Sequence, residues 1–152
     1  MLTPEVAAFV EGGQCIHIGT RDSELESAGM VVVAVVVDSD RSHVTAFLPK
    51  QGSEEVLANL QANGRAALCF GRPVDDHACQ VKGTYVNARP ATKKERAVVD
   101  AQWEQSLRQL EQIGIPRLLW SGYAVWPCIA IRVHVTDVFN QTPGPGAGAP
   151  LT

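Results

Sequence analysis

The sequence has no excess of basic residues. Its 13 Lys and Arg residues are outnumbered by 16 Asp and Glu residues, which gives a formal net charge of −3 at pH 7. Proteins that neutralise many nucleic-acid phosphates concentrate Lys and Arg on one face. The charge balance therefore argues against a nucleic-acid partner.

Apolar runs long enough to cross a membrane are also missing. The longest run, residues 30–37, is far shorter than the roughly 20 residues of a spanning helix, and we expect it to be a buried strand. The opening segment "MLTPEVAAFVEGG" carries acidic residues and ends in glycines, unlike an export signal. We therefore expect a cytoplasmic protein with no membrane partner.

Signatures of metal sites and disulfides are missing as well. The four cysteines form no C-x-x-C pair and lie mostly within apolar runs, which predicts buried free thiols. No two histidines are spaced by four residues on a predicted helix, and all four fall within predicted strands, so cross-strand or surface contacts are expected. We assign no metal site to Cys15, Cys69, Cys79 and Cys128, or to His17, His43, His77 and His134.

The sequence does contain enough apolar material for one core. With 152 residues, of which 45% are hydrophobic, it is long enough for one domain and too short for two comfortable ones. We place this domain at residues 1–140. The remaining residues, 141–152, form a Pro/Gly-rich tail that cannot be regular structure.

Segments rich in β-branched and aromatic residues predict six strands. Polar segments separate the first three, and "DSDRS" at residues 38–42 predicts a hairpin between the second and the third. Within the last strand, Pro127 indicates an edge or a bulge. The predicted strands cover residues 14–20, 30–37, 43–48, 65–70, 77–87 and 123–139.

Capping signals predict the helices that accompany these strands. Thr3 is an N-cap followed by Pro4 at the first helical position, and Thr92 with Glu95 has capping-box spacing. The predicted helices run from Pro4 to Gly12, over residues 53–63, from Thr92 to Gly114, and through a short turn at 116–120.

Six strands with few helices, and tight turns between the early strands, favour a mainly β fold. The pattern is typical of an antiparallel barrel with helices packed outside it. Some strands are apolar on both faces, which in a small barrel means that one face lines the interior. The other face must then be covered by a helix or by a second subunit. We therefore expect a homodimer.

The order of motifs resembles one known family. The succession "IHIGTRD", an apolar strand, "VTAFLPKQGSEEVLANLQANGRAALCF" and "QVKGTYV", followed by a long amphipathic helix, resembles the pyridoxamine 5′-phosphate oxidase-like FMN-binding split-barrel family. The most specific part is a polar turn with a serine near a helix start, then the "NGRAALCF" strand. The resemblance implies a six-stranded antiparallel split β-barrel, a homodimer, and FMN in a cleft between the subunits.

The resemblance also implies a cofactor site. The turn at residues 50–53 falls where the family contacts the flavin phosphate, and a helix that begins at Ser53 offers free N–H groups that suit an anion. The three preceding residues would lie beside the flavin ring or its ribityl chain. The implied cofactor-binding residues are Phe47, Leu48, Pro49, Lys50, Gln51, Ser53, Gln80 and Lys82.

Two functions remain open from the sequence. The first is an FMN-dependent oxidoreductase, with a deazaflavin as a variation, in which the flavin carries the redox chemistry on a small-molecule substrate and no catalytic residue is assigned. The second is a non-catalytic flavin or small-ligand binding protein that keeps the split-barrel dimer. Glu54 and Glu55 favour the second, because they stand where oxidase-like members carry two cations, and carboxylates repel a phosphate.

Overall fold

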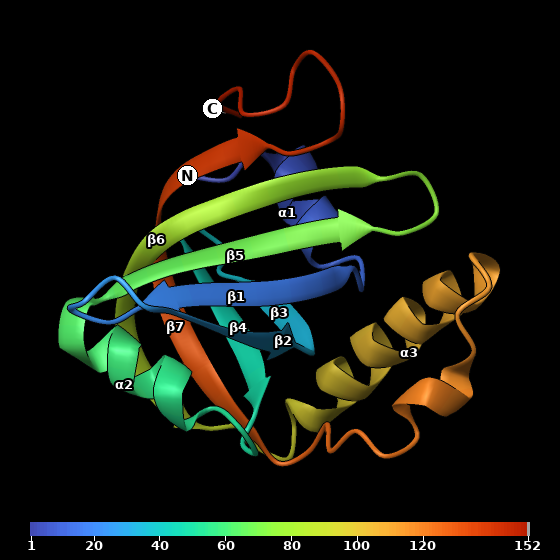
Figure 1. The fold of residues 1–152 in the computed structure, drawn as a ribbon, viewed down its shortest axis with the longest axis horizontal. Coiled ribbons are helices and arrows are strands. Elements are labelled where there is room, and N and C mark those ends of the chain that lie inside the picture. Colours follow the sequence, from blue (N-terminus) through green and yellow to red (C-terminus); the bar gives the residue numbers. More distant parts are fainter. Residues whose placement is uncertain (152) are drawn as a thin grey trace.

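The computed structural model describes residues 1–151 and shows one strongly curled sheet with helices around it (Figure 1). Seven antiparallel strands follow the order β2-β1-β5-β6-β7-β4-β3. The two strands at the ends of this order, β2 (Ser27–Val32) and β3 (Ala34–Val37), are consecutive in the chain. Because the single residue Val33 joins them, the sheet must curl until its two edges approach each other. The predicted mainly β, split-barrel fold is confirmed.

The other elements have the following bounds. The strands are β1 (Cys15–Arg21), β4 (His43–Pro49), β5 (Arg65–Arg72), β6 (His77–Pro90) and β7 (Cys128–Asn140). The helices are α1 (Pro4–Val10), α2 (Glu54–Asn63), α3 (Arg96–Gln112) and the 3-10 turn η1 (Arg117–Trp120). No helix within residues 1–151 is long and apolar enough to cross a membrane.

The prediction of six strands is wrong by one, because the apolar run at residues 30–37 is divided. At the division, the Val33 N–H donates to the Phe47 carbonyl at 2.9 Å. The first half of the run pairs with β1 and the second half pairs with β4. The hairpin expected across residues 38–42 is present, and the Asp38 N–H closes it on the His43 carbonyl at 3.0 Å.

Two apolar clusters hold the fold together. The larger one fills the barrel interior, where Leu68 and Ile131 are fully buried, and Val10 of α1 and Leu60 of α2 pack into it. The smaller one lies outside the barrel, where Val99 of α3 packs against buried residues of β3, β4 and β7. Burying an aliphatic side chain of this size stabilises the folded chain by about 1.5–3 kcal/mol. A helix of the same chain thus covers part of the outer face of the barrel.

Local signals set the helix ends. The Thr3 hydroxyl accepts a hydrogen bond from the Val6 N–H at 3.3 Å, and Gly64 ends α2 in the left-handed conformation with φ of 69°. The Glu95 carboxylate accepts from the Thr92 N–H at 2.7 Å, as the predicted capping box requires. Regular helix nevertheless begins only at Arg96, because residues 92–95 form a turn.

The tail crosses back over the barrel. Its Leu151 N–H donates to the Val138 carbonyl at 2.8 Å, and Pro150 forms an isolated bridge with Phe139. These contacts tie the segment to the end of β7. The division into a domain at 1–140 and a tail at 141–152 stays a prediction.

Candidate functional site

The polar turn between β4 and α2 forms an exposed corner with several donors. The Lys50 N–H donates to the Pro127 carbonyl at 2.8 Å, which fixes the start of the turn, while the Lys50 and Gln51 side chains are exposed. Gly52 has φ of 83°, and a side chain there would meet no atom within 4 Å. The first N–H groups of α2, from Glu54 onward, have no helical acceptor and carry the positive end of the helix dipole.

Ser53 plays a different part from the one expected of an N-cap. Its side chain is 2% exposed, and its hydroxyl donates to the Lys50 carbonyl at 2.8 Å instead of accepting from the helix. The hydroxyl proton is therefore used inside the turn. The donors that remain for an anion are backbone N–H groups, the Lys50 ammonium and the Gln51 side-chain amide. The exposed carboxylates of Glu54 and Glu55 lie in the same first turn and lower its attraction for an anion.

The three residues before the turn belong to the core of this chain. Phe47 is 1% exposed and packs in the cluster beneath α3, whereas Leu48 is 0% exposed and faces the barrel interior. Pro49 is also buried. Their side chains are packed against protein, and their predicted contact with a flavin ring stays a prediction.

Gln80 and Lys82 lie on the outer face of β6. The Gln80 amide donates to the Cys69 thiol of β5 at 3.3 Å, and the Lys82 ammonium lies 4.9 Å from the centre of the Phe139 ring. Lys82 also lines a cleft of about 760 Å³ that includes Asn63 and Gly64 at the end of α2. Lys82 is therefore close to the C-terminal end of α2, whereas the Lys50 turn precedes its N-terminal end.

Strand pairing shows how far apart these two groups are within one chain. Pro49 is paired with Cys128 at the start of β7, and Gln80 is paired with Phe139 near its end. These two β7 residues are separated by 139 − 128 = 11 positions. At about 3.3 Å per residue, this is on the order of 35 Å measured along the curved strand. The ten-residue helix α2, which separates the Lys50 turn from the cleft at Lys82, spans about 15 Å. One chain does not bring the eight predicted cofactor-binding residues together.

Two cations that could have joined such a site are engaged elsewhere. Arg89 forms an ion pair with Glu95 at 2.6 Å, and its guanidinium, together with Thr92, lowers the pKa of that carboxyl to about 2. Arg21 donates to the Asp22 carbonyl at 2.9 Å. Within residues 1–151, Lys50 and Lys82 have no ion-pair partner.

The cysteines are free, as predicted, but they are not all buried. Cys79 and Cys128 are buried, and burial raises the pKa of each thiol to about 12. Cys69 is exposed because its position on β5 faces outward. Of the histidines, His43 and His134 are cross-strand partners whose ring centres lie 4.8 Å apart.

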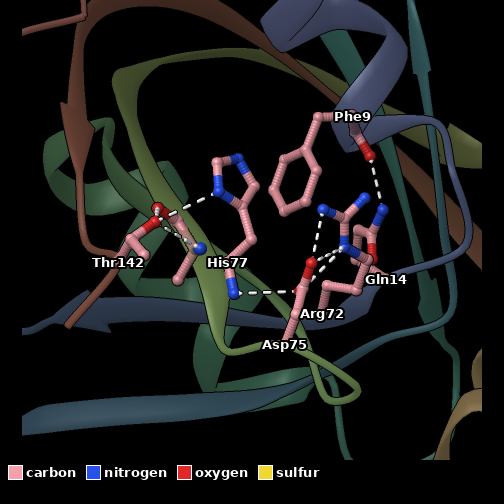
Figure 2. Close-up of polar contacts among 7 residues, drawn as sticks. Phe9, Gln14, Arg72, Asp75, His77 and Thr142 are labelled. Atoms are coloured by element: carbon pink, nitrogen blue, oxygen red, sulfur yellow. Dashed lines mark hydrogen bonds and ion pairs between the residues drawn. The ribbon is translucent and has the colours of Figure 1, made fainter.

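A second cleft was not found from the sequence. It lies beside the hairpin between β5 and β6, where Figure 2 shows Phe9, Arg72 and His77 close together, with Gln14 next to Arg72. Three glutamines of α3 also line it: Gln105, Gln109 and Gln112. Their helical spacing was a usable signal, because residues seven apart share one helix face.

Comparison with known structures confirms the fold. The chain has the split-barrel fold of pyridoxamine 5′-phosphate oxidase-like FMN-binding proteins, and the resemblance found in the sequence is confirmed at this level. No family model and no curated protein sequence matches the chain.

Three solved structures illustrate the likeness. An F420 reductase has a TM-score of 0.60 at 14% identity, over 90% of this chain and 98% of its own. HupZ from Group A Streptococcus has a TM-score of 0.58 at 17% identity, over 98% and 99%. An FMN-binding protein from Syntrophomonas wolfei has a TM-score of 0.57 at 10% identity, over 88% and 82%. Identities this low establish the fold alone.

Proposed function

We propose that the protein is a flavin-dependent oxidoreductase of the cytoplasm that binds FMN, or a deazaflavin in its place, between two copies of the chain. The observation that carries the proposal is the turn at residues 50–53, which presents an exposed ammonium and unpartnered helix N–H groups at one corner. An F420 reductase and an FMN-binding protein share the fold, which supports a flavin-type ligand here.

The residues present suit the anionic tail of such a cofactor. Lys50 and the first N–H groups of α2 would hold the phosphate, and the open space around Gly52 lets a ligand approach the backbone closely. The bound flavin would supply hydride or electron transfer, so no acid or base from the protein is obligatory. The chain's own task is to fix the phosphate and orient the ring.

A second copy completes the site in this proposal. Gln80 and Lys82 of β6 pair near the end of β7, whereas the Lys50 turn lies beside the start of β7. In a two-fold dimer, a partner chain would bring its own Gln80 and Lys82 to the Lys50 turn. The exposed outer face of β5 and β6, with Cys69 and Gln80 on it, is the surface available for that contact. The proposed flavin site therefore requires a homodimer.

A binding protein without catalysis is the second candidate. Glu54 and Glu55 in the first turn of α2, and the inward-turned Ser53 hydroxyl, reduce the site's affinity for a phosphate dianion. In this alternative the dimer is kept, and the ligand carries less negative charge or is bound weakly.

The visible spectrum of the purified protein, followed by titration with FMN and with a deazaflavin, tests the proposal. We expect a yellow protein or saturable binding in the micromolar range, near ~8 kcal/mol. Reduction of the bound flavin by a nicotinamide donor separates the enzyme from the binding protein. A colourless protein that binds neither flavin would reject both flavin roles.

A further inference from the structure

The cleft of about 760 Å³ at the C-terminal end of α2 gathers positive charge. Figure 1 shows the end of β1 and the start of β5 side by side at this end of the sheet. Three cations line the cleft, Arg21, Arg65 and Lys82, against one carboxylate, that of Asp137. The chain as a whole has a net charge of −3, so this positive cleft stands out from the rest of the surface. Its volume falls in the range of small-molecule sites.

Small residues leave the middle of the cleft open. Gly19 of β1 pairs with Ala67 of β5, and Ala67 pairs in turn with Lys82 of β6. Paired residues lie on the same face of a sheet, and the exposure of Gly19 and Lys82 shows that this face points outward. A carbon added to Gly19 would meet only the Ala67 carbonyl oxygen, at 4.0 Å. A ligand can therefore lie directly on the sheet here.

Arg21 and Arg65 lie next to each other on neighbouring strands. Continuing the register of Gly19 and Ala67 by two residues brings the two arginines opposite each other on the same outer face. The Asn63 side chain joins their backbones, because its nitrogen donates to the Arg21 carbonyl at 2.6 Å and its oxygen accepts from the Arg65 N–H at 3.0 Å. Opposite residues have Cβ atoms about 5 Å apart, and like charges at this spacing repel each other. An anion between the two guanidinium groups would relieve that repulsion.

Neither arginine has a carboxylate partner within residues 1–151. Arg21 donates one N–H to the Asp22 carbonyl at 2.9 Å, which leaves its other donors for a ligand. Lys82 is paired with Asp137 in the sheet, but its ammonium lies over the Phe139 ring instead. Most arginines of this chain do form ion pairs with carboxylates: Arg72, Arg89, Arg96, Arg108, Arg117 and Arg132.

We propose that this cleft binds a small polyanion, a molecule with at least two phosphate or carboxylate groups. One anionic group would lie between Arg21 and Arg65, because guanidinium groups form paired hydrogen bonds with such oxygens. A second group would reach the Lys82 ammonium, since Lys82 is opposite Ala67, two residues along β5 from Arg65. Arg21 and Arg65 are not among the predicted flavin contacts, so the inference does not depend on the flavin site. Lys82 alone is common to both.

Titration of the full chain with inorganic pyrophosphate, citrate and acetate tests this class of ligand. The readout is the backbone N–H signals of Gly19, Gly64 and Gly83 in NMR spectra, because these glycines line the cleft. At about 0.15 M salt, we expect saturable shifts with a dissociation constant below about 1 mM for pyrophosphate or citrate. Acetate carries one charged group and should bind at least about tenfold more weakly. The tighter polyanion identifies phosphate or carboxylate as the preferred group.

Three results of this titration would overturn the proposal. They are the lack of saturation with both polyanions up to about 10 mM, equally tight binding of acetate, and saturation that leaves the signals of the three glycines unmoved.

Variants of single arginines locate the site. Arg21→Gln and Arg65→Gln should each weaken binding of the tighter polyanion about fivefold or more, because each removes charge-assisted hydrogen bonds. Arg41→Gln is the matched control, since Arg41 also lacks an ion-pair partner among the described residues but lies in the hairpin between β3 and β4, outside the cleft. Circular dichroism checks that each variant is folded. Equal affinities of Arg65→Gln and Arg41→Gln for the polyanion would show that the assignment is wrong.

FMN binding separates this cleft from the proposed flavin site. Arg21→Gln and Arg65→Gln should change FMN affinity by less than about twofold, although they weaken polyanion binding. A protein that binds the polyanion but no flavin keeps this inference and rejects the flavin role, and the opposite result does the reverse. Equal losses of FMN and polyanion affinity in these two variants would show that the cleft is part of the flavin site, which would overturn a separate polyanion site.

Discussion

Gln102 of α3 hydrogen-bonds to both backbone groups of Val35 on strand β3. Its side-chain oxygen accepts from the Val35 N–H at 2.9 Å, and its nitrogen donates to the Val35 carbonyl at 2.8 Å. Glu11 accepts from the Val37 N–H of the same strand at 2.7 Å. An edge strand otherwise presents unpaired N–H and carbonyl groups to other chains. Two side chains therefore close the edge at which the barrel is split.

Removing this closure should destabilise the fold and expose the edge. Gln102→Ala loses two hydrogen bonds to Val35, and we expect the free energy of unfolding to fall by about 2 kcal/mol. Urea denaturation measures the loss, and light scattering detects association through the freed edge. Gln112→Ala changes the same residue type at an exposed position of the same helix. Equal losses in the two variants would show that the Val35 contact contributes little.

Gly83 occupies a bulge where only a glycine fits. The register between β6 and β7 shifts between Lys82 and Gly83, and a side chain at Gly83 would collide with the backbone of His134 and with Val133. Gly83→Ala should lower the free energy of unfolding by about 1–3 kcal/mol, because the backbone of His134 can shift only at a cost in free energy. Gly71→Ala on β5 is the control, since nothing lies within 4 Å of its added carbon. Thermal unfolding measures the stability of both variants, and equal losses for Gly83→Ala and Gly71→Ala would contradict this prediction.

The ion pair between Glu95 and Arg89 predicts a pH dependence of stability. The pKa of Glu95 falls from an ordinary 4.5 to about 2 in the folded chain, chiefly because Arg89 donates hydrogen bonds to it. A lowered pKa means stabilisation that is complete above 4.5 and is lost as the pH falls towards 2. The stability difference between the native chain and Glu95→Gln should therefore shrink over that interval. A difference independent of pH would contradict this account.

Lys50 should matter more for flavin binding than Arg89. Lys50 is exposed beside the free N–H groups of α2, whereas Arg89 is held by Glu95. Lys50→Ala should weaken FMN binding by about tenfold, the usual size of one charge-assisted contact, and Arg89→Ala should change it little. Isothermal titration calorimetry measures both dissociation constants. Equal effects of the two substitutions would count against the placement of the phosphate.

Local signals in the sequence were sufficient for most of the fold. Thr3, Gly64 and the pair of Thr92 with Glu95 mark helix ends through contacts within a few residues, so they are readable from the sequence. The break at Val33 was not readable, because the run from Val31 to Val37 is uniformly apolar and largely β-branched. The run is divided only in the folded chain, where its first half pairs with β1 and its second half pairs with β4.

The candidate sites depended more on contacts distant in the sequence. A turn is present at residues 50–52, as predicted, but the Ser53 hydroxyl donates to the Lys50 carbonyl instead of capping α2, which residue type alone does not reveal. The distance between Lys50 and Gln80 follows from the register on β7, which no local pattern encodes. Gln109 was not among the residues predicted for a site, and its amide is buried against the Gly13 carbonyl, which is far away in the sequence.

A mixing experiment with two variants tests most directly whether the flavin site is shared between two chains. Lys50→Ala and Lys82→Ala are purified, each expected to bind FMN weakly, and are then mixed under conditions that exchange subunits. In a mixed two-fold dimer, one site carries both alanines and the other is intact, so about a quarter of the sites should regain native FMN affinity. If the mixture binds FMN no better than the separate variants, although subunits have exchanged, the site does not lie between two copies.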